Sequence, residues 1–112
     1  MCQQGRVGKK MYMAPEVISL SNTLLPTKAD VWSLGVVLFC MLTGVPPMDT
    51  AHATDQRFVY ITRGRIQALL TQWGYSRISP AAVDLLKRML TADFYNRISI
   101  QEITQHAWLN DA

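Results

Sequence analysis

The sequence predicts an all-α fold, and three observations support this prediction. A run of mostly apolar residues, Val31–Leu42, is flanked by a helix-capping residue, Thr27, and a helix-stopping residue, Gly44. Apolar residues also recur at helical spacing after Ser79-Pro80. No stretch alternates apolar and polar residues as a half-buried strand does. At 112 residues, the chain has room for one helical domain or part of one.

The N-terminal part is expected to be a loop followed by one short helix. Met1–Lys10 shows no periodicity. Met11–Pro15 cannot continue as a regular helix, because the residue before a proline is pushed out of the α region. Pro15 suits a first helical position, so a short helix is predicted over Glu16–Leu20. Ser21–Pro26 is then expected to be a loop.

The central helix is predicted between Thr27 and Gly44. Thr27 can serve as the N-cap, Asp30 completes a capping-box spacing, and Gly44 is suited to the residue after the last turn. A helix that is apolar on every face is expected to be buried. The run is too short to cross a bilayer, which takes about 20 apolar residues. Gly35 at its centre costs about 1 kcal/mol relative to Ala, which indicates that another backbone passes close by.

Two helices are predicted in the next part of the chain. Thr54 can cap a helix that extends to about Thr62 and carries Phe58 and Ile61 inward. A second helix is predicted over Ile66–Trp73. The glycines that follow these helices, Gly64 and Gly74, are expected to end them.

The C-terminal part is predicted to hold two helices with clear start signals. Ser79 and Pro80 are suited to the N-cap and N1 positions. The apolar residues that follow form a core-facing stripe of Val83, Leu85, Leu86, Met89 and Leu90. Ser99 and Glu102 have capping-box spacing. They predict a helix over Ile100–Ala107 with Ile103 and Ala107 facing inward.

Composition argues against nucleic-acid and membrane partners. The net charge is +3, and the basic residues are scattered. The short clusters Lys9-Lys10 and Arg63-x-Arg65 have no accompanying nucleic-acid motif, so a solvated surface is the simpler interpretation. The first ten residues lack the apolar region of a signal peptide. A cytoplasmic or otherwise intracellular location is therefore expected.

Several short motifs follow one another in a recognisable order. They are Gly8-x-x-x-Tyr12-Met13-Ala14-Pro15-Glu16, Asp30-x-Trp32-x-x-Gly35, Gly44-x-Pro46-Pro47, Asp84-Leu85-Leu86 with Met89-Leu90, Asp93-x-x-x-Arg97 and His106-Ala107-Trp108-Leu109. Together they resemble the C-terminal lobe of Ser/Thr protein kinases, from the end of the activation segment to the last helix. The resemblance covers essentially residues 1–112 and is closest to the calcium/calmodulin-dependent branch.

The resemblance implies roles for particular residues. Residues 1–112 would form part of a kinase domain, the helical portion of the C-terminal lobe. The substrate-facing loop would comprise Gly8, Lys9, Tyr12 and Met13. The structural motif residues would be Ala14, Pro15, Glu16, Asp30, Trp32, Gly35 and Arg97. Glu16 is expected to pair with Arg97 in a partly buried, bidentate contact, for which Arg is better suited than Lys.

Two departures from the family pattern qualify the resemblance. Lys9 stands where Ser/Thr kinases usually carry threonine, so it supplies charge but no hydroxyl. Gly5 lies about where an activating phosphothreonine would be, so the usual phosphate switch is not expected here. Tyr12, where tyrosine kinases typically carry tryptophan, still favours a Ser/Thr parent.

The motifs that perform phosphoryl transfer in this family are not found in the sequence. The Gly-rich loop, the strand lysine, the Asp base with its Asn, and the metal-binding Asp-Phe-Gly motif have no match. Asp93-Phe94-Tyr95 lacks the glycine and follows Ala14-Pro15-Glu16, whereas the metal motif precedes it. The chain itself is therefore expected to contain no catalytic and no metal-binding residue, and ATP and magnesium are expected only in an intact parent kinase.

The expected partners are a protein substrate or regulatory protein and the missing N-terminal part of the kinase. Without that part, apolar residues among Val31, Leu34 and Leu38 should be exposed or covered only by Met1–Lys10. Asp30 should remain solvated at an open helix start. Two other interpretations stay open: a non-catalytic interaction module that uses the surface around Phe58–Trp73, and a generic small helical bundle.

Overall fold

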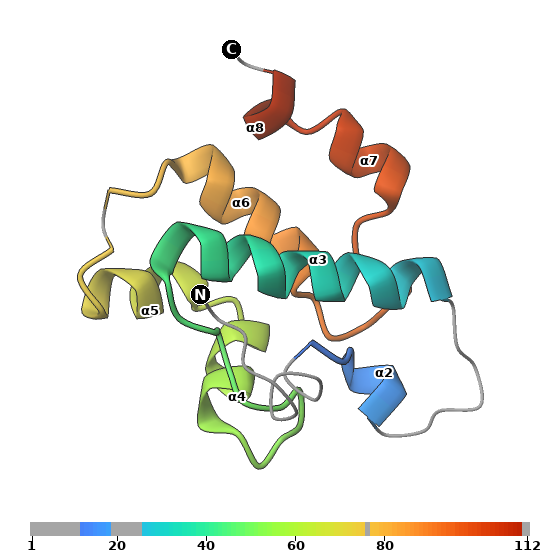
Figure 1. Ribbon diagram of the computed structural model, residues 1–112, viewed down its shortest axis with the longest axis horizontal. Helices are drawn as coiled ribbons and strands as arrows, with labels where there is room; N and C mark the ends of the chain where they lie inside the picture. Colours follow the sequence, from blue (N-terminus) through green and yellow to red (C-terminus); the bar gives the residue numbers. More distant parts are fainter. Residues whose placement is uncertain (1–11, 19–25, 76, 111–112) are drawn as a thin grey trace.

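The computed structural model describes residues 12–18, 26–75 and 77–110 (Figure 1). The described part is helical and contains no strand, in agreement with the predicted all-α class. Its helices are α2 (Pro15–Ile18), α3 (Pro26–Thr43), α4 (Gln56–Thr62), α5 (Ile66–Gln72), α6 (Pro80–Met89), α7 (Ile100–Thr104) and α8 (Ala107–Asn110). The predicted loop Met1–Lys10 and residues 21–25 of the predicted loop Ser21–Pro26 lie outside the described part. Pro26 was wrongly assigned to that loop, because it begins α3.

Helix α3 lies at the centre of the fold, and the other helices are arranged around it (Figure 1). Its most extensive partner is α6, and α7 contacts it as well. Helices α4 and α5 pack against each other, and α5 also contacts α6. The long apolar segment that the sequence predicted to organise the chain therefore does so.

The core consists of two groups of side chains that meet at α3. In the larger group Trp32, Val36 and Phe39 of α3 pack with residues of the following loop and of α4, α5 and α6. Edge-to-face and tilted ring contacts occur within it: Phe39 with Trp73 and Trp32 with Phe58, both at 6.2 Å between centroids. In the smaller group Val31 packs against Leu85, Met89 and Ile98.

Gly35 lies at a close contact between α3 and the end of α6. A Cβ atom at this position would stand 2.9 Å from Cβ of Met89 and 3.0 Å from Cδ2 of Leu90. The glycine therefore allows close packing, as expected, although the neighbouring atoms belong to side chains rather than to the backbone.

The ends of the helices agree with the sequence at their glycines but differ at two caps. Gly44, Gly64 and Gly74 all have positive φ, between 81° and 90°, as expected for helix stops. The prediction that Thr27 caps α3 is wrong, because the helix already begins at Pro26. Helix α4 is capped by Asp55 rather than Thr54: its carboxylate accepts hydrogen bonds from the backbone N–H groups of Arg57 and Phe58.

The C-terminal helices begin as predicted, but the last one is interrupted. Ser79 caps α6, and Ser99 with Glu102 forms a complete capping box at α7. Helix α7 ends at Thr104, and a separate turn, α8, begins at Ala107. Ala107 is exposed rather than inward-facing. The break occurs because the His106 ring accepts a hydrogen bond from the backbone N–H of Trp108, which starts a new turn.

The prediction that α3 is buried on every face is wrong along one line of residues. Leu34, Val37 and Met41 are 48%, 40% and 77% exposed. They are spaced at i, i+3 and i+7, so they form one continuous strip, here called the exposed stripe. Val31, which was also expected to be exposed, is fully buried, and Leu38 is half-buried. No helix in the described ranges is long and apolar enough to span a membrane.

Candidate functional site

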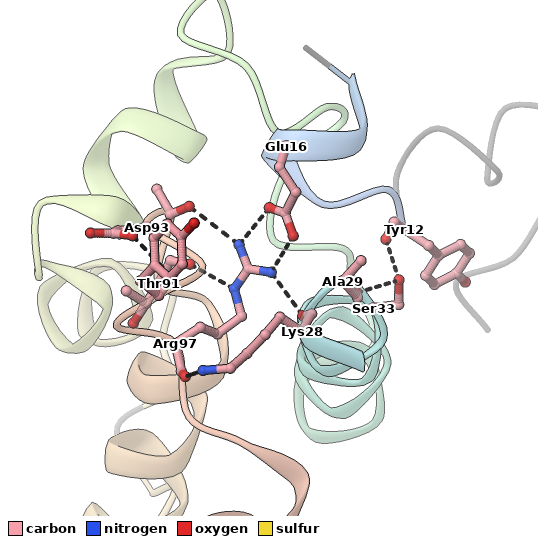
Figure 2. Close-up of polar contacts among 10 residues, drawn as sticks. Tyr12, Glu16, Lys28, Ala29, Ser33, Thr91, Asp93 and Arg97 are labelled. Carbon is pink, nitrogen blue, oxygen red and sulfur yellow. Dashed lines mark hydrogen bonds and ion pairs between the residues drawn. The ribbon is translucent and has the colours of Figure 1, made fainter. Parts of the chain in front are cut away.

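The most highly organised polar site joins Glu16 of α2 to Arg97 in the loop after α6. Both side chains are buried, with 4% and 1% relative exposure. Nη1 of Arg97 lies 2.8 Å from Oε2 of Glu16, and Nη2 lies 2.8 Å from Oε1 (Figure 2). The ion pair that the sequence predicted is therefore present, with the bidentate geometry that distinguishes Arg from Lys.

The remaining N–H groups of Arg97 bind backbone carbonyls. Nε donates to the carbonyl of Thr91 at 2.8 Å, Nη1 to that of Lys28 at 2.8 Å, and Nη2 to that of Ala92 at 3.3 Å. With the two bonds to Glu16, all five N–H donors of the guanidinium have an acceptor. The guanidinium also lies 5.1 Å from the centroid of the Trp32 ring. Arg97 thus connects α2, the first turn of α3 and the loop after α6.

Ser33 forms a second connection to α3, which the sequence did not indicate. Its hydroxyl donates to the carbonyl of Tyr12 at 2.6 Å and contacts that of Ala29 at 3.3 Å (Figure 2). Tyr12 belongs to the predicted substrate-facing loop, so Ser33 anchors the end of that loop to the central helix. The position of Ser33, directly after the motif residue Trp32, was the only available signal.

The other predicted site residues differ in burial and in their position along the helices. Ala14 is buried, Met13 is half-buried, and Pro15 begins α2. Trp32 is fully buried, and its Nε1 has no hydrogen-bond partner within the described ranges. Asp30 is exposed in the first turns of α3, as expected for a solvated carboxylate. Gly8 and Lys9 lie outside the described residues, so their role in a substrate-facing loop stays a prediction.

A second polar cluster joins α6 to the residues before α8. Oδ2 of Asp84 accepts from Nε of Arg88 at 2.8 Å and lies 2.7 Å from Nε2 of His106. Because Nδ1 of His106 accepts from the Trp108 backbone, we assign the ring proton to Nε2, which donates to Asp84. These hydrogen bonds, first from Arg88 and then from His106, hold the pKa of Asp84 below its ordinary value. The sequence did not indicate the contact between Asp84 and His106, because these two residues are 22 positions apart.

Magnesium bound with a nucleotide would need a cluster of acidic side chains. No group of three or more His, Cys, Asp or Glu side chains in the described ranges could hold a metal ion. Asp93, whose sequence context imitates the metal motif, instead stabilises a turn. Its carboxylate accepts from the backbone N–H of Tyr95 at 3.0 Å and from the Asn96 side chain at 2.9 Å. The expectation that this chain binds no ATP or magnesium stays a prediction.

Comparison with known proteins identifies the family. The model of the protein kinase domain matches residues 2–109. This chain therefore belongs to the protein kinase domain family. Its helices correspond to the helical part of the C-terminal lobe.

Curated proteins similar to this chain include calcium-dependent protein kinases of plants. Calcium-dependent protein kinase 14 and calcium-dependent protein kinase 2 of Oryza sativa subsp. japonica are 40% and 39% identical over 105 residues, or 94% of this chain. Calcium-dependent protein kinase 24 of Arabidopsis thaliana is 38% identical over 106 residues, or 95% of the chain. The chain spans only 17–19% of the length of these relatives. It is a Ser/Thr kinase domain fragment similar to the calcium-dependent kinases.

Proposed function

We propose that this chain forms the structural base of a Ser/Thr protein kinase domain and does not transfer phosphate by itself. In an intact parent kinase, it would support ATP-dependent phosphorylation of a protein substrate or regulatory protein. Gly8, Lys9, Tyr12 and Met13 would face that substrate. An intracellular location is part of this proposal.

The exposed stripe is the observation that carries the proposal. Leu34, Val37 and Met41 form a strip of apolar surface on a helix whose other faces are largely buried. Contiguous apolar surface of this kind marks an interface. Asp30 lies four residues before Leu34, which places an exposed carboxylate at one end of the same helix face. Both features are explained if another part of a kinase domain packs against this face of α3.

The nucleotide would be held by that other part. The described carboxylates do not form a metal site, and several are already engaged in caps and ion pairs. ATP and magnesium would therefore bind residues that the described helices do not supply. Protein partners would include the remaining kinase lobe, whereas nucleic acid and membranes are not expected.

Isothermal titration calorimetry with ATP and magnesium tests the proposal. We expect no binding tighter than about 1 mM, which corresponds to about 4 kcal/mol. A parallel assay with a generic peptide substrate should show no phosphate transfer. Saturable ATP binding in the micromolar range would contradict the proposal, because it would require a nucleotide site within this chain.

A further inference from the structure

One segment of this protein carries basic residues without any acidic residue. Between Asp55 and Asp84 the sequence contains four arginines and no aspartate or glutamate. Helices α4 and α5 and the turn between them all lie in this segment. Because the proposed kinase function does not use this surface, its charge requires a separate explanation.

Within the described ranges, unpaired positive charge gathers at the turn between α4 and α5. Arg63 and Arg65 flank Gly64 in this turn, and both are exposed. Lys87 of α6 adds a third cation, because its Cε lies 3.8 Å from the place where a Cβ on Gly64 would stand. We call these three residues the basic turn. In the described ranges, none of them forms an ion pair with a carboxylate, whereas Arg57 pairs with Asp49 at 3.1 Å.

A groove lies beside the basic turn. It has a volume of about 390 Å³ and is lined by Gln56, Arg57, Tyr60, Leu69 and Gln72. The guanidinium of Arg65 lies 6.0 Å from the centroid of the Tyr60 ring, so the basic turn and the groove share a border. The half-buried Tyr60 supplies the main apolar contact surface, since Leu69 is only 6% exposed. The two glutamine amides can bind peptide N–H and C=O groups.

We propose that this groove and the basic turn form a docking surface for an acidic segment of a partner protein. Aspartate or glutamate side chains of that segment would pair with Arg63, Arg65 and Lys87. The neighbouring residues of the segment would lie in the groove, against Tyr60 and Leu69 and between the glutamine amides. Unpaired cations beside an apolar groove provide the charge complementarity that steers and orients such a partner.

A polypeptide fits this surface better than a nucleic acid or a membrane. Asp49 and Asp55 lie beside Arg57 at the groove and would repel a long polyanion that followed it. Insertion into a membrane requires exposed large apolar residues, and none of those on the described surface lies within 56–75 or 77–83. A segment that carries a short acidic run avoids both difficulties.

Fluorescence polarisation on the full chain tests the proposal. The probe is a short fluorescein-labelled Glu-Gly repeat peptide, and a Gln-Gly repeat of the same length is its uncharged counterpart. We expect the Glu-Gly peptide to bind with a dissociation constant below about 1 mM. Binding should weaken in high salt, since salt screens exposed charges. The Gln-Gly peptide should bind much more weakly.

Two charge-reversal variants locate the binding surface. R63E/R65E should weaken binding of the Glu-Gly peptide about tenfold or more, since both changes put like charge against the acidic probe. Arg77→Glu is the matched control, because Arg77 is exposed but lines a different groove. It should change the affinity less than about twofold. Far-UV circular dichroism verifies that all variants keep their helices.

Any of three results would overturn the proposal. The first is equal binding by R63E/R65E and the unchanged protein. The second is equal binding of the Gln-Gly and Glu-Gly peptides. The third is tighter binding, with the same dependence on Arg63 and Arg65, of oligothymidylate or of phosphatidylserine vesicles, which would assign the surface to a nucleic acid or a membrane.

Discussion

Arg97 shows how a single charged side chain can be buried at acceptable cost. Removing a guanidinium and a carboxylate from water costs several kcal/mol per ion unless their hydrogen bonds are replaced. Here Glu16 takes two of the five N–H groups, and backbone carbonyls take the others. The site is therefore a fully satisfied network rather than an isolated ion pair, and removing one partner leaves the other buried and uncompensated.

Removing either partner of this pair should destabilise the protein strongly. We expect Glu16→Ala and Arg97→Ala each to cost about 3–5 kcal/mol, compared with about 0–1 kcal/mol for an exposed ion pair. Urea unfolding of the two single variants and the double variant gives the coupling energy. Arg97→Lys should also be strongly destabilised, because a lysine ammonium cannot bind both carboxylate oxygens in parallel.

The matched control for this cycle is the exposed pair of Asp84 and Arg88. The two side chains are 45% and 59% exposed, and the residues are spaced at i, i+4 on α6. Arg88→Ala should therefore cost less than about 1 kcal/mol. A coupling energy near zero between Glu16 and Arg97 would show that the buried pair does not form in solution.

Asp55 should make stability depend on pH. Burial raises the pKa of its carboxyl, but hydrogen bonds from four backbone N–H groups outweigh burial, so that the pKa lies below its ordinary value of 3.8. The donors are the backbone groups of Asp49, Thr50, Arg57 and Phe58. A lowered pKa in the folded state gives stabilisation that is complete above the ordinary value and is lost as the pH falls through the folded value.

Comparison of Asp55→Asn with the unchanged protein tests this effect. Asn caps helices about as well as Asp but does not titrate. Its Nδ2 cannot accept the bonds that Asp49 and Thr50 donate to one carboxylate oxygen of Asp55. We therefore expect a lower urea midpoint for Asp55→Asn than for the unchanged protein near about pH 7, and a smaller loss of stability for Asp55→Asn on acidification to about pH 3. Asp55→Ala should lose about 0.5–2 kcal/mol at neutral pH. Identical acid sensitivity of the Asn variant and the unchanged protein would contradict the assignment.

At the scale of helices, the contact of α3 with α6 depends on Gly35. Alanine at this position would gain about 1 kcal/mol of helix propensity. Its Cβ, however, would stand 2.9 Å from Cβ of Met89, which cannot rotate away. Since overpacking a core costs about 1–3 kcal/mol, we expect a net loss of stability.

Thermal unfolding followed by circular dichroism measures the effect of Gly35→Ala. Leu34→Ala, one residue away on the exposed stripe, is the control and should change the midpoint less, because Leu34 is 48% exposed. If Gly35→Ala raised the midpoint, the two helices could separate at no cost, and the close approach would not be a requirement of the fold.

The helices that could be predicted are those whose signals are local. Ser79-Pro80, the Ser99–Glu102 capping box and the three stop glycines act within one helical turn, and all of them are found as predicted. The errors arose where two signals competed. Thr54 and Asp55 are both good caps, and Asp55 prevails because it also accepts hydrogen bonds from Asp49 and Thr50. Those bonds depend on the shape of the preceding loop, which the sequence does not reveal.

The candidate site was predictable only where a family resemblance supplied the distant partner. The Glu16–Arg97 pair spans 81 residues, and neither periodicity nor spacing would have connected its members. The contacts of Ser33 with Tyr12 and of His106 with Asp84 were missed for the same reason. The resemblance predicted that apolar surface of α3 would be exposed, and Leu34 is exposed as predicted. The sequence did not indicate that the rest of this surface would be formed by Val37 and Met41 rather than by Val31.

At the scale of the whole molecule, the exposed stripe predicts that the purified chain binds apolar molecules or other copies of itself. We expect the purified chain to bind a hydrophobic dye such as ANS, to melt without a sharp transition, or to self-associate. Replacing Leu34, Val37 and Met41 together by Gln should remove most of the dye signal. The helix should be retained, because Gln is a good helix former.

Ile100→Gln combined with Leu109→Gln is the matched control for the stripe. Both residues are exposed and apolar but lie elsewhere, at 42% and 53% exposure. Dye binding should be largely unchanged in this variant. A monomeric chain with no dye binding and one cooperative melt would show instead that it is a self-sufficient domain, and would contradict the proposed structural role.

The position of Arg97 in the chain also determines when its contacts can form during folding. Joining Glu16 to Arg97 directly in an unfolded chain would close a loop of 81 residues, with an entropic cost of about 4 kcal/mol from the logarithmic length dependence. Once α3 and α6 have docked, only the short connections on either side remain to be ordered, and the cost falls. The ion pair should therefore assemble after the central helices. Its loss should accelerate unfolding and leave the folding rate nearly unchanged.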